Sequence, residues 1–189
     1  MRFILASASP RRLSLLKQIY LTPDDVIPAD INEDPIPGEL PGPHAKRLAS
    51  EKCQTIADRE TDAVILAADT VVGVGRRILP KTETETEAAQ CLDLLSGRAH
   101  RVFTGIAIYS PDNGLQSRVV ETRVKVKRLS EREKKIYIES EEWRGKAGGY
   151  GIQGYAESFI QSLSGSYSNV VGLPLTETRN LLQFYGIGS

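Results

Sequence analysis

Few residues of the kinds that build disulfide frameworks, metal centres or catalytic triads occur in this sequence. Its 189 residues include two cysteines and two histidines. Cys53 and Cys91 form neither a CxxC pair nor the spacing of a zinc finger, so we expect two buried free thiols, which fits a reducing cytoplasm. His44 and His100 are too isolated to indicate a Ser-His-Asp arrangement. The chemistry has to come from other side chains.

An excess of one charge and long apolar runs are also missing. Lysine and arginine together number 24, as do aspartate and glutamate, so the formal net charge is zero. Nothing in this balance favours nucleic acid or an anionic membrane as a partner, and any anion site has to be built locally. The apolar run at 3–6 stops at Ser7, far short of a signal-peptide core, and no run reaches membrane-spanning length. We therefore expect a cytoplasmic protein.

The sequence does contain an alternation of predicted strands and helices. At this length we expect one domain over residues 1–189. Early alternation followed by an antiparallel hairpin favours an α/β fold with a mixed sheet. A Pro-Asp-Asn-Gly turn at 111–114 predicts the hairpin, and Ser130 with Glu133 forms a capping-box pattern. Strands are predicted at 3–6, 26–27, 63–74, 102–109 and 115–126, and helices from Pro10, at 44–57, 83–95 and 130–143, and from Pro174 to about Gly186.

The bend that follows the first strand, with the sequence SASPRR at 7–12, is a candidate anion site. Ser9 and Pro10 are typical of an N-cap and a first helical position. Arginines in a first helical turn oppose the helix dipole, and a bound phosphate would supply a reason for them. Ser7 and Ser9 add hydroxyl donors, while Arg11 and Arg12 add planar groups that match phosphate oxygens. The alternative is that both arginines are solvated surface charges.

Asp69 is the one acid inside the most apolar predicted strand. A carboxylate there is unfavourable unless it is paired, binds a metal or stands at the strand's end, and sites in open α/β sheets gather at the carboxyl ends of strands. We therefore expect Asp69 and Thr70 to mark where this strand leaves the core. Glu33 follows another apolar strand, and the two carboxylates could hold Mg²⁺ or Mn²⁺ against a phosphate chain. The alternatives are a capping aspartate and a solvated acidic loop.

A glycine-rich segment at 145–154 does not match a Walker A loop, because its lysine comes early and no serine or threonine follows it. Its glycines still let the backbone approach a ligand closely, and Gln153 offers a donor and an acceptor to a base edge. Lys52, on a predicted helix, and Lys81, beyond a short hairpin, could each reach phosphate or be solvated. Carboxylates, arginines and lysines in this combination suit phosphoryl or nucleotidyl transfer to water.

Together these segments resemble the Maf family of nucleoside triphosphate pyrophosphatases, also called septum-formation inhibitor-like proteins. The resemblance implies a single α/β domain of the inosine-triphosphate-pyrophosphatase-like kind, with an elongated mixed sheet, two lobes and a central cleft. It implies cytoplasmic hydrolysis of a nucleoside triphosphate to the monophosphate and pyrophosphate, with a divalent cation, and a homodimer. The matching stretches span nearly the whole chain in the family's order: LASASPRRLSLL, the run at 30–33, RLASEKC, ILAADTVV, Lys81, LSGRAHRVFTGIAI, EEWRGKAGGYGIQGYAESFI and GSYSNVVGLPL.

The resemblance also implies roles for individual residues. Asp69 would be the proton acceptor, and Glu33 would be a polar residue of the cleft. From the residues themselves we expect Glu33 and Asp69 to be the ligands of the metal ion. The sequence departs from the family pattern around Lys81, because the family often has Gly-Lys-Pro where this chain has Pro80-Lys81-Thr82. Phosphate-binding residues would be Ser7, Arg11, Arg12, Lys52 and Lys81.

Three further positions distinguish two branches of the family. Arg12, Thr70 and Gln153 are the residues of the branch that acts on dTTP and UTP, which implies removal of these and modified pyrimidine nucleotides from the nucleotide pool. The branch that acts on 7-methyl-GTP has different residues there, including an acid in place of the glutamine. One alternative is therefore the 7-methyl-GTP activity, and another is a non-catalytic nucleotide-binding regulator of cell division.

Overall fold

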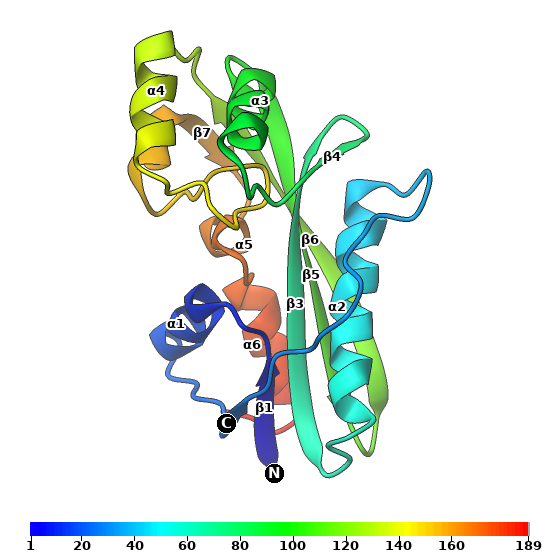
Figure 1. Cartoon of the computed structure of the whole chain (residues 1–189). Coiled ribbons are helices and arrows are strands. Elements are labelled where there is room, and N and C mark those ends of the chain that lie inside the picture. Colours follow the sequence, from blue (N-terminus) through cyan, green and yellow to red (C-terminus); the bar gives the residue numbers. More distant parts are fainter. Residues whose placement is uncertain (189) are drawn as a thin grey trace.

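The computed structural model describes residues 1–188, and within them the core is a seven-stranded mixed sheet (Figure 1). The strand order is β2-β1-β3-β5-β6-β7, and β4 pairs with β3 as well. β1 runs parallel to β2 and β3, and the remaining pairs are antiparallel. The predicted α/β fold with a mixed sheet is confirmed. The strands are β1 (Arg2–Ala6), β2 (Asp25–Val26), β3 (Ala63–Val74), β4 (Arg77–Leu79), β5 (Ala99–Ser110), β6 (Gly114–Val126) and β7 (Ile160–Ser164).

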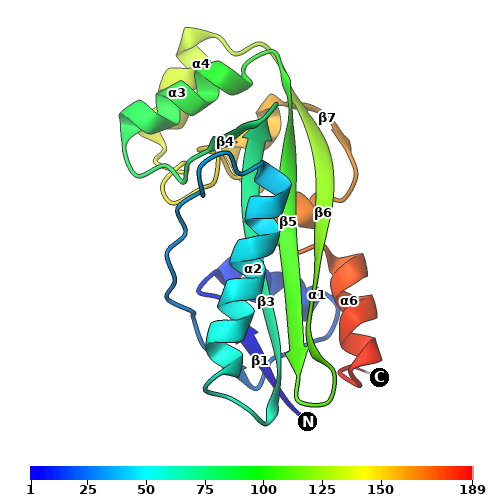
Figure 2. The ribbon, with the colours of Figure 1, turned by 90° about the vertical axis from the view of Figure 1, so that its right-hand side faces the viewer.

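The helices lie in layers on the two faces of this sheet (Figures 1 and 2). One face is covered by α2, and the opposite face carries α1, α5 and α6. At one end of the molecule α3 and α4 pack together beside β7, and at the other end α1 and α6 lie near β1, which gives two lobes along the long strands. The helices are α1 (Pro10–Gln18), α2 (Pro41–Ala57), α3 (Glu85–Leu95), α4 (Glu131–Glu139), α5 (Tyr167–Val171), α6 (Leu175–Phe184) and a 3₁₀ turn at Tyr155–Phe159.

Strand β3 is the centre of the core because it is buried on both faces. Side chains at even positions, such as Leu66 and Ala68, pack into the larger apolar cluster with α1, α3 and α6. Side chains at odd positions, such as Ile65 and Ala67, pack against α2. This alternation follows from the two-residue period of a strand. It also assigns Asp69 to the α2 face and Thr70 to the opposite face.

A close approach between α2 and the sheet determines that a side chain of α2 can reach Asp69. Gly105 on β5 is the register partner of Asp69. A Cβ atom at Gly105 would lie 2.1 Å from the carbonyl oxygen of Ala45 in α2, so only glycine lets the helix backbone come this near. Because α2 is held against the sheet here, its Lys52 can reach Asp69.

Among the helices of residues 1–188, none combines the length and the apolar composition that a membrane-spanning segment needs.

Several predicted boundaries differ from the structure. The helix predicted from position 44 begins at Pro41, because proline takes the first helical position after Leu40. The helix predicted to reach 143 ends at Glu139, and the chain turns through a positive φ of 58° at Glu141. The capping box of Ser130 and Glu133 is confirmed. β7 and α5 were not predicted, since each has only five residues and little periodicity.

Candidate active site

The candidate site lies at a gap in one edge of the sheet, beside β3. β1 ends with Ala6 opposite Ala67, and β4 first pairs at Val72. Within the part of the chain that the structure describes, residues 68–71 therefore have no strand partner on that edge. A cavity of about 360 Å³ opens at the gap. The expectation that Asp69 marks the end of its own strand is wrong, because β3 continues to Val74 and it is the neighbouring strand that ends.

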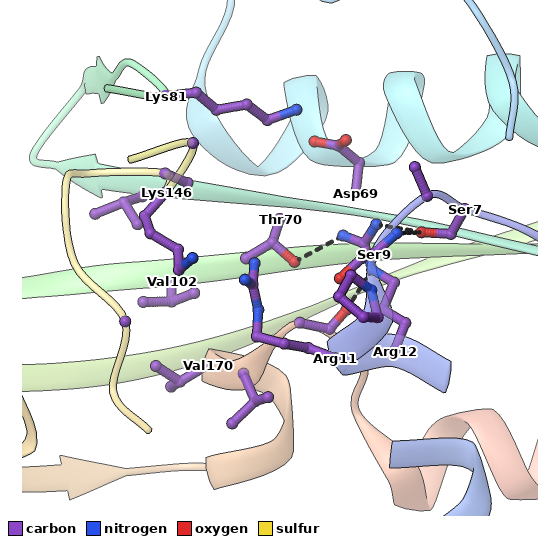
Figure 3. A pocket seen from close by; sticks show the side chains of 18 of the residues that line it. Ser7, Ser9, Arg11, Arg12, Asp69, Thr70, Lys81, Val102, Lys146 and Val170 are labelled. Atoms are coloured by element: carbon purple, nitrogen blue, oxygen red, sulfur yellow. Dashed lines mark hydrogen bonds between the residues drawn. The ribbon is translucent and has the colours of Figure 1, made fainter. Parts of the chain in front are cut away.

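The gap gives the cavity access to both faces of the sheet, and different charges line each face (Figure 3). Asp69 points toward α2, and Lys81 lies on this same side of β3. Thr70 points to the other side, toward Arg11 and Arg12. The α2 face holds carboxylates together with lysines that pair with them. The opposite face holds Arg11 and Arg12, which form no ion pair with any carboxylate of residues 1–188. The cavity is therefore divided between an acidic side and a cationic side.

On the cationic side, α1 begins with unused hydrogen-bonding capacity. Ser9 is the N-cap residue, yet its side chain makes no capping hydrogen bond, and Pro10 follows at the first helical position. The Ser7 hydroxyl oxygen accepts from Arg12 Nη1 at 3.0 Å and from the Ser9 backbone N–H at 3.2 Å. Both contacts use its lone pairs, so its own proton is free to donate to an anion.

Arg12 is held rigidly by three neutral acceptors. Its Nε donates to the carbonyl oxygen of Gly172 at 2.8 Å and its Nη2 donates to Thr70 Oγ1 at 3.2 Å, in addition to the Ser7 contact. Burial lowers the pKa of Arg12, while the negative charges of Asp69 and Glu33 act in the opposite direction. This guanidinium is preorganised at the gap and keeps further N–H groups for a ligand.

Thr70 is oriented by a buried chain of hydrogen bonds. Thr104 Oγ1 donates to the carbonyl oxygen of Asn169 at 2.9 Å, so it must accept the proton of Thr70 Oγ1, which lies 2.9 Å away. Asn169 is in turn fixed by its Nδ2 donating to Val102 O at 3.1 Å. Because Thr70 donates inward and accepts from Arg12, its hydroxyl can offer only an acceptor to a bound molecule.

On the acidic side, Lys52 joins the two carboxylates that the sequence singles out. Its Nζ lies 2.6 Å from Asp69 Oδ1 and also contacts Glu33 Oε1. The Asp69 side chain is 3 % exposed and that of Lys52 is 9 % exposed. Lys81 contacts the other carboxylate oxygen of Glu33. Partial burial acts to raise the pKa of Glu33, but the hydrogen bonds from both lysines outweigh it and lower the pKa to about 2.

The glycine-rich segment at 145–154 closes the cavity from the other lobe. Tyr150 is anchored by its hydroxyl, which lies 2.6 Å from His100 Nε2, and the two rings pack edge to face. Burial lowers the pKa of His100 to about 4, so this imidazole is neutral at physiological pH. His100 is structural, as expected. Gln153 is exposed and lies at the rim of the cavity.

All of the residues nominated from the sequence line this one cavity. Among the other lining residues is one charged side chain that was not nominated, Lys146. A lysine among glycines matches no phosphate-binding motif, so only its place in the fold identifies it. The nominated residues that the structure brings together are Ser7, Arg11, Arg12, Glu33, Lys52, Asp69, Thr70, Lys81 and Gln153.

This arrangement can bind a polyanion and position water next to a buried base. Unpaired guanidinium groups, a free serine hydroxyl and the start of α1 favour phosphate oxygens. The carboxylates on the other face supply oxygen ligands of the kind that a hard cation prefers. A molecule that spans the gap would contact both sides at once.

Comparisons with known proteins agree with the sequence pattern. A protein of Maricaulis maris named dTTP/UTP pyrophosphatase is 66% identical over 185 residues, which is 98% of this chain and 88% of that protein. A protein of the same name from Caulobacter vibrioides is 58% identical over 183 residues, 97% of this chain and 95% of its own. The solved structure of the Staphylococcus aureus Ham1 protein is similar with a TM-score of 0.49 and 16% identity, covering 67% of this chain and 72% of that one. The family model described as Maf-like protein matches residues 2–185, and the chain therefore belongs to the Maf family.

Proposed function

We propose that this chain hydrolyses nucleoside triphosphates, dTTP and UTP with modified pyrimidine nucleotides, to the monophosphate and pyrophosphate. Its similarity to two proteins named dTTP/UTP pyrophosphatase supports this activity. The observation that carries the proposal is the division of one cavity between two faces of β3: on one face lie arginines that form no ion pair within residues 1–188, and on the other lies a buried carboxylate. Such a division suits a triphosphate attacked from one side, with its phosphate charge held on the other.

In this proposal the residues of the chain have distinct tasks. Asp69 accepts a proton from the water that attacks the α-phosphorus, and Lys52 holds the carboxylate in place. Ser7 and Arg12 bind phosphate oxygens with the N–H and O–H groups that the fold leaves unused. Arg11 and Lys81 neutralise further charge on the triphosphate. A general base and charge-stabilising groups are each typically worth ~10²–10⁴ in rate.

Glu33 and Asp69 would hold a divalent cation, Mg²⁺ or Mn²⁺. Both carboxylates already converge on a cation in this structure, the ammonium group of Lys52, and carboxylate oxygens are the donors that hard ions prefer. Residues 1–188 contain no cluster of three or more acidic, histidine or cysteine side chains placed to hold an ion. Phosphate oxygens and water would therefore complete the coordination. When bound, such an ion supplies positive charge next to the phosphate chain.

Base selection is assigned in this proposal to Arg12, Thr70 and Gln153. Gln153 is exposed at the rim, where its amide can donate to and accept from a base edge. Thr70 offers an acceptor, as its hydroxyl proton is taken by Thr104. A glutamate at position 153 could only accept, whereas the amide can pair with an edge that presents both a donor and an acceptor, as N3–H and O4 of uracil and thymine do. The 7-methyl-GTP activity is the alternative within the same reaction class.

The test of this function is the Asp69→Asn variant. We expect the variant to fold and to lose pyrophosphate release from dTTP and UTP in Mg²⁺ or Mn²⁺ by ~10²-fold or more. The matched control is Asp112→Asn, which alters an exposed acid in the β5–β6 turn. Hydrolysis in H₂¹⁸O should place the label in the monophosphate, because the water attacks the α-phosphorus. A variant within about tenfold of the wild type would remove Asp69 from this role.

Competition among dTTP, UTP, 7-methyl-GTP and dITP distinguishes the branches, since the preferred substrate suppresses turnover of the others. Tight dTTP binding without any pyrophosphate release would favour a non-catalytic nucleotide-binding regulator instead. The reaction is assigned to the cytoplasm, where free thiols such as those of Cys53 and Cys91 persist. The homodimer implied by the resemblance stays a prediction.

A further inference from the structure

We propose that Arg47 is a positioning residue: through its ion pair with Glu39 it holds the segment at 28–40 in place and so presents Glu33 to the divalent cation. This inference rests on the proposed function and adds a residue to it. The segment at 28–40, here called the strap, joins β2 to α2 and runs alongside α2 on its way to the first helical residue (Figures 1 and 2). Glu33 lies near the middle of the strap.

The strap has few contacts of its own that would fix its position. None of its residues is buried, and it contains no strand or helix. Within residues 1–188, no backbone–backbone hydrogen bond involves positions 28–35. Among the apolar residues of the strap, Ala29 at its start packs against the core cluster on the α2 face. The position of the strap around Glu33 therefore depends on polar contacts with other elements.

Arg47, in the second turn of α2, supplies such contacts. Its Nε donates to Glu39 Oε1 at 2.8 Å and its Nη2 donates to Glu39 Oε2 at 2.9 Å, which is a two-point pairing of planar groups. Its Nη2 also donates to the carbonyl oxygen of Asp34 at 3.0 Å. Within residues 1–188, this is the one hydrogen bond that a side chain outside the strap makes to the strap backbone. One guanidinium group therefore ties the residue after Glu33 and the end of the strap to α2.

The Glu39 carboxylate is held from several sides. Its Oε2 also accepts from the Ile36 N–H at 3.0 Å and lies 2.8 Å from Nδ1 of the buried His44. The Glu39 side chain is 10% exposed, and hydrogen bonds from Arg47 lower the pKa of Glu39 to about 2. The pair is therefore ionised at neutral pH, and loss of Arg47 would leave a largely buried carboxylate without its main partner.

The lysine contacts of Glu33 cannot replace this anchor once a cation is bound. Lys52 contacts both Glu33 and Asp69, the two carboxylates assigned to the cation. Lys52 would compete with a divalent cation for these carboxylate oxygens. Arg47 acts next to Glu33 through Asp34 and uses no oxygen of Glu33, so its contacts persist in either state. Arg47 also precedes Lys52 by about 7.5 Å along the axis of α2, so one helix positions both carboxylates.

The experiment compares Arg47→Met with Glu39→Gln, which breaks the pair from the other end, and with a control, Lys46→Met. Lys46 is the neighbouring residue on α2 and is exposed. Binding of Mn²⁺ is measured by electron paramagnetic resonance, with a dTTP analogue that carries an imido bridge between its α- and β-phosphates. Loss of an outer contact of a metal ligand predicts Mn²⁺ binding weakened by about tenfold in Arg47→Met, and Glu39→Gln should change it in the same direction. The kcat for dTTP at saturating Mn²⁺ should stay within about threefold, because the ligands themselves are intact.

Two further measurements separate positioning from a general loss of stability. In a Glu33→Gln background, where Asp69 and the phosphates still bind Mn²⁺, Arg47→Met should change Mn²⁺ affinity by less than about twofold, because the carboxylate that it positions is gone. A glutamate-specific protease should cleave after Glu33 about tenfold faster in Arg47→Met than in the wild type, since cleavage requires the strap to open. The Lys46→Met control should match the wild type in Mn²⁺ affinity and in cleavage rate.

Three results would overturn the inference: Mn²⁺ affinity of Arg47→Met within about twofold of the wild type, an equal loss of affinity in the Glu33→Gln background, or an unchanged rate of cleavage after Glu33. Neither Mn²⁺ binding nor proteolysis needs turnover, so the two proposals can fail separately. A wild type that releases no pyrophosphate from dTTP, but whose Mn²⁺ affinity depends on Arg47 as expected, would contradict the proposed function and support the positioning role. An active wild type with an unaffected Arg47→Met variant would contradict only the positioning role.

Discussion

Replacing Lys52 with methionine tests whether the fold depends on this lysine to keep Asp69 buried as an ion. Asp69 is 2 % exposed, and its one ion-pair partner within residues 1–188 is Lys52, at 2.6 Å. Glu33, the other carboxylate that Lys52 contacts, is about a third exposed and also pairs with Lys81. Loss of Lys52 therefore isolates Asp69 far more than Glu33.

The expected loss of free energy of unfolding depends on which charged side chain loses its ion-pair partner. Removing one partner of a buried ion pair typically costs 3–5 kcal/mol, so we expect Lys52→Met to lower the free energy of unfolding by about 3 kcal/mol. Asp69→Asn leaves Lys52 paired with Glu33, and its expected loss is about 1 kcal/mol. In the double variant no isolated carboxylate remains, so its loss should be smaller than the sum of the two by at least ~1.5 kcal/mol.

Urea unfolding followed by circular dichroism at neutral pH measures these differences. With a slope of about 2 kcal/mol per molar urea, Lys52→Met should shift the midpoint down by roughly 1.5 M. The control is Lys135→Met, which removes an exposed pair with Glu139 at 3.8 Å and should change stability by less than about 0.5 kcal/mol. If Lys52→Met were no more destabilising than Asp69→Asn, or if the double variant were additive, Lys52 would not be compensating a buried charge.

Two further predictions concern groups that burial perturbs. Burial lowers the pKa of His100 to about 4, whereas the unfolded chain binds this proton below pH ~6.5. The free energy of unfolding is therefore unaffected by His100 above that pH, and it falls by up to about 3 kcal/mol as the pH drops toward 4. Urea midpoints at pH 7.5 and 5 should show this loss, and His100→Gln should flatten the slope; equal slopes would contradict it. Burial raises the pKa of Cys53 to about 12 and that of Cys91 to about 11, so a disulfide reagent at pH 8 should label both thiols only after unfolding, and rapid labelling of the native protein would count against their burial.

The parts of the site that local sequence predicts are those that depend on neighbours in the chain. The 7–12 bend could be predicted as the start of a helix because Pro10 is suited to the first helical position, directly after the N-cap residue Ser9. The β5–β6 hairpin follows from its turn residues for the same reason. Lys146 could not be found this way. It lines the cavity because its loop packs against β3, more than sixty residues earlier in the sequence, where a Cβ atom at Gly148 would lie 2.9 Å from the Val72 side chain.

By itself the sequence determined the order of the elements, the apolar strand around Asp69 and the supply of cations and acids, since these depend on composition and local periodicity. Only the tertiary structure decided that β1 ends before Asp69 and β4 begins after it, leaving the gap where the cavity opens. It also decided that Asp69 meets Lys52 on one face while Thr70 meets Arg12 on the other. Strand register and helix docking are set by contacts between distant segments, and the pattern along one chain does not contain those distances.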